Sequence, residues 1–202
     1  MRSTFRSLAL PSAALAVAGL LAGCTGMSTG APGTPGNAGG KTFTGMRVTS
    51  SAFADNTVMP AEHAGAGDCG GRNVSPPVAW RDLPAKARSV AVLVFDPDGA
   101  AGLGVSHWVA YNIPAERGEL QAGEGQPGAN PAFTMGPNVA GAPAYRGACP
   151  PVGDRPHHYV LTVIASDLAP GALPAGLGRD ALLAALKGHA LGGQSVVGLY
   201  SR

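Results

Sequence analysis

From residue 43 onward the chain consists of short apolar, β-branched runs separated by stretches rich in glycine, proline and asparagine. Runs of this length that end at turn-forming residues favour strands over helices. The run that begins at Ser89, for example, stops at the turn cluster Asp96–Gly99. We expect strands over Phe43–Val48, Ser89–Phe95, His107–Asn112, Tyr159–Ala165 and Val196–Tyr200.

Only one segment has the periodicity of a helix. From Arg179 to Lys187, the residues Leu182, Leu183 and Leu186 share one face, and Gly188 follows as the expected C-cap. Asp180 in the first turn suits the positive end of the helix dipole. The pattern therefore predicts a mainly β fold with few peripheral helices and long loops, the longest of them between Glu116 and Gly147.

Another apolar run, Leu8–Leu21, follows Arg2 and Arg6 at the start of the chain. A basic start, an apolar run of this length and small residues after it are typical of a signal peptide, and the run is short for a permanent membrane span. The next residues, Leu21-Ala22-Gly23-Cys24, resemble the lipobox of bacterial lipoproteins, in which the cysteine becomes the lipidated first residue. The alternative is cleavage nearby that leaves Cys24 as an ordinary thiol.

The chain is therefore expected to consist of three segments. Residues 1–23 are expected to be the signal peptide, and residues 24–41 the lipidated cysteine with a Gly/Pro/Ser/Thr-rich linker. Residues 42–202 have the length of one domain with its own core. This organisation predicts a protein that is exported to the cell envelope and anchored to a membrane, on its periplasmic or extracellular face.

Charge and cysteine content narrow the function classes. The chain has 14 basic and 12 acidic residues, but two of the basic ones, Arg2 and Arg6, lie in the signal peptide, so the remainder is neutral. Its basic residues are scattered, which excludes the clustered footprint of a nucleic-acid-binding protein. If Cys24 is lipidated, Cys69 and Cys149 are the only pair left in an oxidising compartment, which favours a disulfide over two separate buried thiols.

Polar residues collect where the predicted core strands begin or end. The three segments are Asp96-Pro97-Asp98, Ser106-His107-Trp108 and the loop from Gly147 to Tyr159, which contains Cys149-Pro150-Pro151 and His157-His158-Tyr159. Taken singly, each has a structural explanation as a turn, a packed pair at a strand start or an irregular loop. Their order along the chain resembles the phosphatidylethanolamine-binding protein family, in particular its bacterial Raf kinase inhibitor-like branch. Three further segments carry the resemblance, namely Asn73–Trp80, Gly188–Leu191 and Val197–Arg202.

The resemblance implies a large central β-sheet packed by a smaller sheet, with few peripheral helices. It also implies a small anion pocket near the surface that accepts phosphate-bearing head groups. The residues matched to that pocket are Asp96, Pro97, His107, Gly147, Ala148, Cys149, Pro150, His157 and Tyr159.

These residue types suit an anion. Imidazole N–H groups, a tyrosine hydroxyl and loop backbone N–H groups all donate hydrogen bonds to phosphate oxygens. The carboxylate of Asp96 would repel a phosphate, so we expect it to orient a histidine and to raise the proton affinity of that ring.

We therefore expect a lipid-anchored protein that binds an anionic small molecule or phospholipid head group, without a cofactor or metal. Inhibition of a partner kinase or protease is a further possibility that the resemblance alone suggests. The alternative is a hydrolase or metal-dependent enzyme that uses Asp96, His107 and His157. Against catalysis, the chain has no Gly-x-Ser-x-Gly elbow, and Cys149 is expected to be committed to a disulfide.

Overall fold

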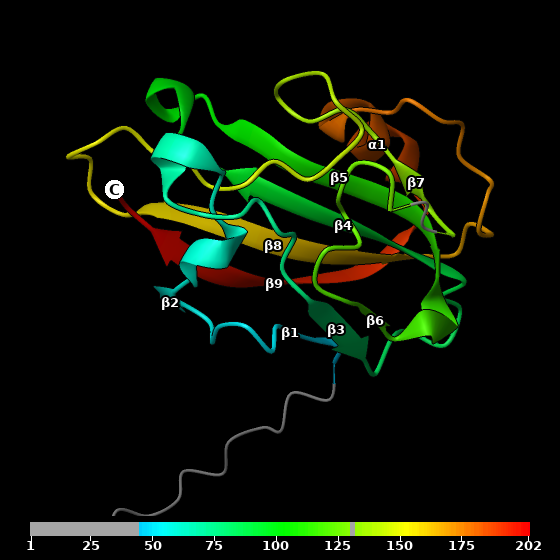
Figure 1. The fold of residues 1–202 in the computed structure, drawn as a ribbon. Coiled ribbons are helices and arrows are strands. Elements are labelled where there is room, and N and C mark those ends of the chain that lie inside the picture. The colour runs from blue at the N-terminus through cyan, green and yellow to red at the C-terminus, as the bar shows by residue number, and fades with distance from the viewer. Residues whose placement is uncertain (1–44, 130–131) are drawn as a thin grey trace, which may run out of the picture. The chain divides into compact units, whose positions relative to one another are not determined.

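The computed structural model describes residues 45–129 and 132–202. The protein contains two β-sheets of unequal size (Figure 1). The large sheet has the order β2-β9-β8-β4-β5-β7 and the small one the order β1-β3-β6. This mainly β architecture confirms the fold that the resemblance implied. The large sheet contains β2 (Thr57–Val58), β4 (Ser89–Asp96), β5 (Val105–Pro114), β7 (Thr134–Met135), β8 (His157–Ser166) and β9 (Ala190–Tyr200), and the small one contains β1 (Arg47–Thr49), β3 (Val78–Arg81) and β6 (Glu119–Leu120).

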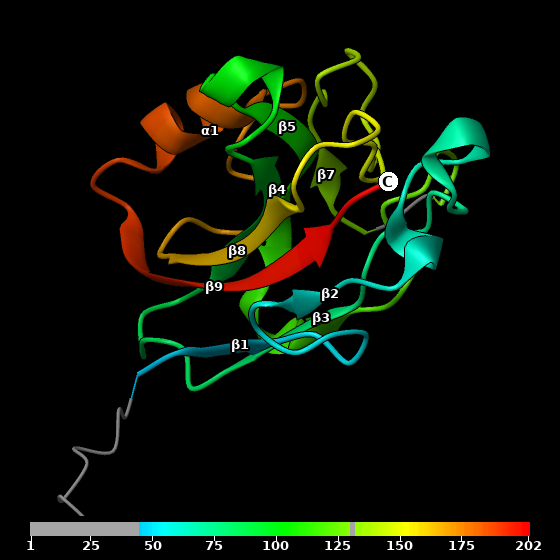
Figure 2. The ribbon, with the colours of Figure 1, turned by 90° about the vertical axis from the view of Figure 1, so that its left-hand side faces the viewer.

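The large sheet lies between two other layers. The small sheet covers one face, and the helix α1 (Arg179–Leu186) covers part of the other (Figure 2). In the central strand β4, Val90, Val92 and Val94 point into the core between the sheets, while Ala91 and Leu93 pack beneath α1. Because both faces of β4 are buried, its sequence is apolar without alternation.

The predicted strands that begin at Ser89, His107 and Tyr159 are confirmed as β4, β5 and β8. Each observed strand is longer than its prediction, by between one and four residues. The last predicted strand is the second half of β9, whose first half contains Gly192 and Gly193 and therefore lacks a strand signal. The first predicted strand, Phe43–Val48, is displaced toward the C-terminus, because β1 covers Arg47–Thr49. Phe43 itself lies outside the described residues. The short strands β2, β6 and β7, of two residues each, were not predicted.

The helix is confirmed, but its predicted end is not. The helix α1 stops at Leu186, its C-cap residue is Lys187 in an extended conformation, and Gly188 has a φ of 86°. The backbone N–H of His189 donates to the Leu186 carbonyl at 2.9 Å. Gly188 therefore occupies the third position of a turn with the type II pattern, which needs a positive φ there, rather than capping the helix directly. None of the helices within the described ranges is long and apolar enough to span a bilayer.

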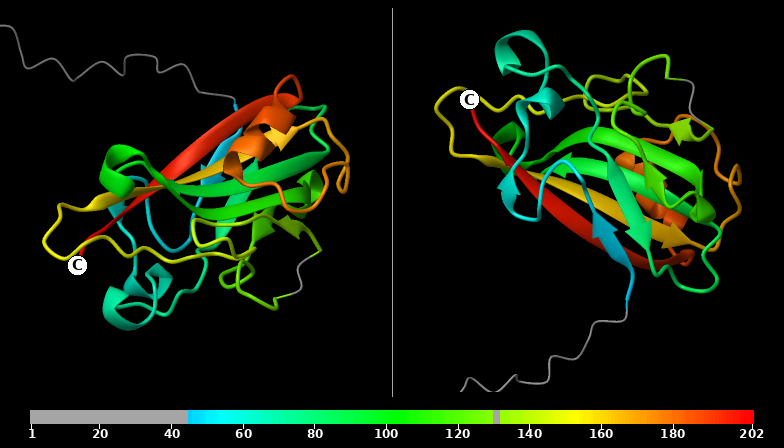
Figure 3. Two further views of the ribbon diagram at one scale, coloured as in Figure 1. Left: turned by 90° about the horizontal axis from the view of Figure 1, so that it is seen from above. Right: turned by 60° about the horizontal axis from the view of Figure 1, so that its bottom comes forward.

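Antiparallel pairing brings the polar segments together. The end of β4 lies beside the start of β5 (Asp96 opposite Val105) and the start of β8 (Phe95 opposite Val160). The loops that carry the predicted pocket residues therefore gather at one edge of the large sheet (Figure 3). Three short 3-10 helices lie beside these loops, namely η1 (Ala61–His63), η2 (Gly67–Cys69) and η3 (Ala100–Gly102). A fourth, η4 (Ala115–Arg117), follows the far end of β5.

Candidate ligand-binding site

A cavity of about 420 Å³ opens at this edge of the sheet. Seven of the nine predicted pocket residues line it, namely Asp96, His107, Gly147, Cys149, Pro150, His157 and Tyr159. The other two do not reach its wall. Pro97 is exposed, and Ala148 is fully buried, with its carbonyl accepting a hydrogen bond from the N–H of Gly65 at 2.8 Å.

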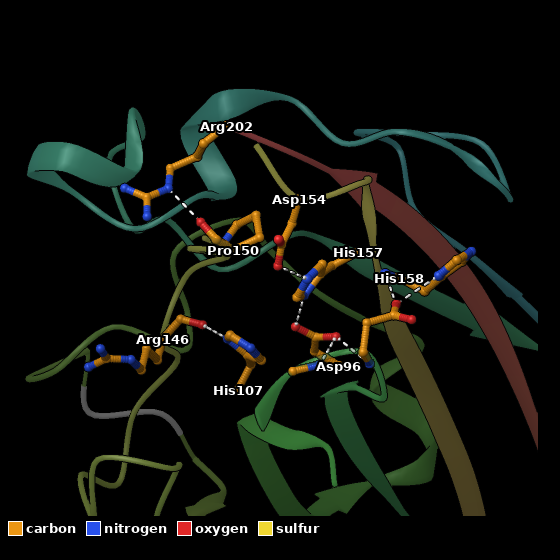
Figure 4. A network of polar contacts seen from close by, with 10 residues as sticks. Asp96, His107, Arg146, Pro150, Asp154, His157, His158 and Arg202 are labelled. Carbon is orange, nitrogen blue, oxygen red and sulfur yellow. Dashed lines mark hydrogen bonds and ion pairs between the residues drawn. The ribbon is translucent and has the colours of Figure 1, made fainter. Parts of the chain in front are cut away.

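His157, the first residue of β8, is held by the last residue of β4. Its Nδ1–H donates to Oδ2 of Asp96 at 2.9 Å, and Oδ1 of Asp96 accepts the backbone N–H groups of Asp98 and Gly99 at 2.9 and 3.0 Å (Figure 4). Burial opposes the charged form of His157, but the hydrogen bond and the negative charge of Asp96 outweigh it and raise the pKa of the imidazole. Asp96 thus orients a histidine and raises its proton affinity, as we expected from the sequence.

His107, near the start of β5, has the opposite electrostatic setting. Burial lowers the pKa of its imidazole, although the Arg146 carbonyl and the Asp96 carboxylate both favour the protonated form. Its Nδ1 lies 2.7 Å from the carbonyl oxygen of Arg146. A carbonyl only accepts hydrogen bonds, so Nδ1 carries the proton of the neutral ring. The pKa values of the two cavity histidines are therefore shifted in opposite directions.

Tyr159 supplies a hydroxyl at the cavity wall. The residue is 2% exposed, and its Oη is buried without a hydrogen-bond partner among the described residues. Burial and the negative charge of Asp96 raise the pKa of the phenol, which keeps it protonated and able to donate. The ring packs edge-on against His107, with centroids 5.2 Å apart. A buried hydroxyl without a partner costs about 1–3 kcal/mol unless another group satisfies it.

Three charged residues of the wall, Asp98, Arg146 and Asp154, were not among the predicted pocket residues. Arg146, directly before the predicted loop, lines the cavity. Asp154 lies on the exposed loop before β8, with its Oδ2 3.5 Å from Nε2 of His157. Both stand next to residues that the sequence singled out, but an exposed charge on a loop carries no signal of the direction in which it points.

The loop at Gly147 is fastened to the segment around η1 and η2. The backbone N–H of Gly147 donates to Oδ1 of Asn73 at 2.7 Å. This N–H is therefore already used and does not serve as the free anion donor that we expected from the sequence. Cys69 and Cys149 form the predicted disulfide, with Cα atoms 5.0 Å apart. The disulfide and the Asn73 hydrogen bond hold one wall of the cavity in place.

The residues after β9 strengthen the same junction. The guanidinium of Arg202 donates to the carbonyls of Pro150 and Asp68, at 2.6 and 2.9 Å. Tyr200 adds a hydrogen bond from its hydroxyl to the carbonyl of Cys69 at 2.8 Å. The segment Val197–Arg202, which the sequence marked without a role, therefore supports the loops of the cavity.

We expect Gly147→Ala to disturb this wall. A Cβ atom at this position would lie 2.4 Å from the backbone carbon of Ala64 and from the nitrogen of Gly65, so the loop must shift. The expected loss of unfolding free energy is about 1–3 kcal/mol, measured by urea denaturation. Gly192→Ala is the matched control, because its Cβ would meet only Cγ of Pro84 at 3.6 Å. Equal stability of the two variants would contradict the close approach.

The remaining histidines do not line the cavity. His63 is fully buried and packs in the core, with Nδ1 2.9 Å from the carbonyl of Val74. His158 and His189 are exposed and face Asp98 and Asp167, each at 2.8 Å. Among residues 45–129 and 132–202, no group of three His, Cys, Asp or Glu side chains is arranged to hold a metal ion.

The geometry defines a two-sheet β protein with a small polar cavity at the edge of its main sheet. The sequence matches the profile of the family described as phosphatidylethanolamine-binding protein over residues 49–201. The chain belongs to this family.

Relatives and solved structures agree with this assignment. A UPF0098 protein of Methanothermobacter thermautotrophicus is 34% identical over 160 residues, which cover 78% of this chain and 99% of the relative. LppC of Mycobacterium tuberculosis, which is named as a lipoprotein, is 33% identical over 186 residues, covering 85% of this chain and 88% of its own. The crystal structure of Escherichia coli YbcL, described as a member of the mammalian PEBP family, matches with a TM-score of 0.73 at 29% identity, covering 78% of this chain and 98% of YbcL.

Proposed function

We propose that the protein is an envelope lipoprotein that binds a phosphate-bearing small molecule or phospholipid head group in the cavity at the ends of β4, β5 and β8. One observation carries the proposal: His157, whose imidazole has a raised pKa, and Tyr159, whose hydroxyl has no hydrogen-bond partner among the described residues, line the same cavity of about 420 Å³. A readily protonated imidazole and a neutral donor at one site favour an anion with several acceptor oxygens. Arg146, a further basic residue, also lines the cavity.

Binding is favoured over catalysis by the state of the reactive groups. Cys149 is in a disulfide and is not available as a nucleophile. Asp96, His107 and His157, the residues of the alternative enzyme hypothesis, are each engaged with protein partners: Asp96 with backbone N–H groups and His157, and His107 with a carbonyl. Such contacts orient the side chains toward a ligand without providing an activated nucleophile.

NMR titration with glycerol 3-phosphate tests the proposal. We expect saturable shifts of the imidazole signals of His107 and His157, while the exposed ring of His189 stays unchanged as an internal control. If the imidazole signal of His107 or of His157 does not shift at millimolar ligand, the assignment of the site to phosphate is overturned.

The anchor is a separate part of the proposal, and Cys24 lies outside the described residues. Its support is the lipobox-like Leu21-Ala22-Gly23-Cys24 and the likeness to LppC. We expect Cys24→Ala to leave an unprocessed precursor without acyl chains, detected by mass spectrometry of the membrane and soluble fractions. Recovery of a normally processed, membrane-bound variant would contradict lipidation at this residue.

A further inference from the structure

The outer edge of the large sheet is open along part of β9. The strand β2 and the two residues before it cover β9 only from Val197 onward. Alternate residues of a strand direct their backbone groups to the same side, so Gly193 and Ser195 direct theirs outward, as Val197 does. Both residues are exposed, and within the part of the chain that the structure describes these outward backbone groups have no hydrogen-bond partner.

This stretch of edge lacks the features that usually protect one. Sheet edges are commonly blocked by charged side chains, by proline or by a bulge. The segment Ala190–Val196 contains no charged residue and no proline, and the register shift between β8 and β9 lies before Gly192. Gly193 and Ser195 therefore present a regular edge to which another extended chain can add.

A groove of about 360 Å³ lies beside this edge, between β9 and β1. Figure 2 shows β1 below β9, on the side of the small sheet. The apolar lining of the groove includes Val48, Phe53 and Val196. The side chain of Gln194 accepts the backbone N–H of Val48 at 2.8 Å, so this face of β9 points into the groove. A residue added directly opposite Gln194 has its side chain on the same face and can enter the groove.

The charge of the groove indicates what kind of chain fits. Of the described residues that line it, only Asp55 is charged, and its Oδ1 accepts the backbone N–H of Val197 at 2.8 Å. An added chain with a basic side chain at this end is therefore attracted. A second copy of this chain matches less well. Antiparallel pairing of two β9 edges about Gln194 would place a second Gln194 over the apolar lining and Gly192, which has no side chain, toward Asp55.

We propose that the edge of β9 at Gly193 and Ser195 binds an extended, basic segment of a partner protein by antiparallel strand addition. The backbone of the segment pairs with these two residues. An apolar side chain enters the groove opposite Gln194, and a basic side chain two residues earlier in the segment reaches Asp55. The backbone hydrogen bonds supply affinity and the alternate side chains supply specificity. The groove shares no lining residue with the anion cavity, so the two sites are independent.

The peptide acetyl-Lys-Thr-Val-Thr-amide is the probe, titrated into the ¹⁵N-labelled protein and followed by NMR. We expect saturable shifts of the backbone amide signals of Gly193 and Ser195 at millimolar peptide. The same peptide with both threonine nitrogens methylated cannot donate to the edge, because the threonines lie opposite these two residues. It should bind at least about 10-fold more weakly, the effect of two hydrogen bonds. Equal binding of the methylated peptide, or no saturable shift at the two amides, would overturn the inference.

Variants of the edge test the same contacts from the protein. Ser195→Pro removes one outward N–H but leaves the ladder to β8 its donors, and Ser195→Ala is the matched control that keeps the N–H. We expect about fivefold weaker binding for Ser195→Pro, the effect of one hydrogen bond, and unchanged binding for Ser195→Ala. Full affinity in folded Ser195→Pro would contradict the proposal. If this variant does not fold, the methylated peptide still tests the bond.

Asp55→Asn tests the charge of the partner, because it keeps an acceptor for the N–H of Val197. The wild-type protein should prefer the lysine peptide to its glutamate analogue, and Asp55→Asn should lose this preference. A preference that survives in the variant would refute the role of Asp55. Analytical ultracentrifugation covers the other occupant: a dimer that Ser195→Pro abolishes would show that a second copy, and not a partner segment, pairs with the edge.

Discussion

Replacing Cys69 and Cys149 together by serine is expected to lower the free energy of unfolding by about 4–5 kcal/mol. The bond joins residues 80 positions apart, and closing a loop of this length removes entropy from the unfolded chain by about that amount. Urea denaturation of the double variant and of the oxidised wild-type protein measures the difference.

The disulfide also borders the cavity, so its removal should change the affinity of the cavity for its ligand. We expect weaker phosphate binding in the double variant, because the bond ties the Cys149 wall to the η2 segment. The Asn73 and Arg202 hydrogen bonds remain and should preserve part of the affinity. Unchanged stability after removal of the bond would show that these contacts alone fix the two segments.

The second large effect concerns His157. His157→Ala is expected to weaken binding of a phosphate monoanion by about 1.5–3 kcal/mol, the contribution of a hydrogen bond from a charged group, or about 10- to 150-fold in Kd. The exposed His189→Ala is the matched control and should bind as the wild-type protein does. Calorimetric titration with dimethyl phosphate at pH 5 makes the comparison, because this ligand does not change charge with pH.

The pH dependence follows from the direction of the pKa shift. Because the pKa of His157 is raised, its imidazolium persists to a higher pH than that of an ordinary histidine side chain. Affinity for dimethyl phosphate should be greatest below that pKa and should fall as the pH rises through it. His157→Ala should remove this dependence. A wild-type affinity that stays constant from about pH 5 to pH 9, a window that contains the ordinary histidine pKa of about 6.5, would contradict the role of the imidazolium.

The sequence predicted the elements whose burial leaves a clear pattern. β4 and β8 are long apolar runs because they lie in the middle of the large sheet, and α1 presents Leu182 and Leu186 at helical spacing. The first half of β9 contains glycines and could not be predicted as a strand from its sequence. It pairs with β8 because of tertiary contacts rather than β propensity. The two-residue strands have no pattern to detect.

The candidate site divides in the same way. Asp96, His107, His157 and Tyr159 were predicted because they border core strands and match family motifs. The engagement of the Gly147 N–H by Asn73 was not predictable, because the two residues are 74 positions apart and their contact depends on how the loops pack. The hydrogen bond between His107 and the Arg146 carbonyl likewise joins residues 39 positions apart, so it is seen only in the folded structure.

The most direct test of the account is the pKa of His157, measured by imidazole ¹⁵N NMR with and without saturating dimethyl phosphate. If the anion binds the imidazolium, linkage requires the ligand to raise this pKa by about one to two units, the equivalent of about 1.5–3 kcal/mol. The pKa of His189 should not change. Saturable binding that leaves the pKa of His157 where it was would contradict the placement of the anion at this residue.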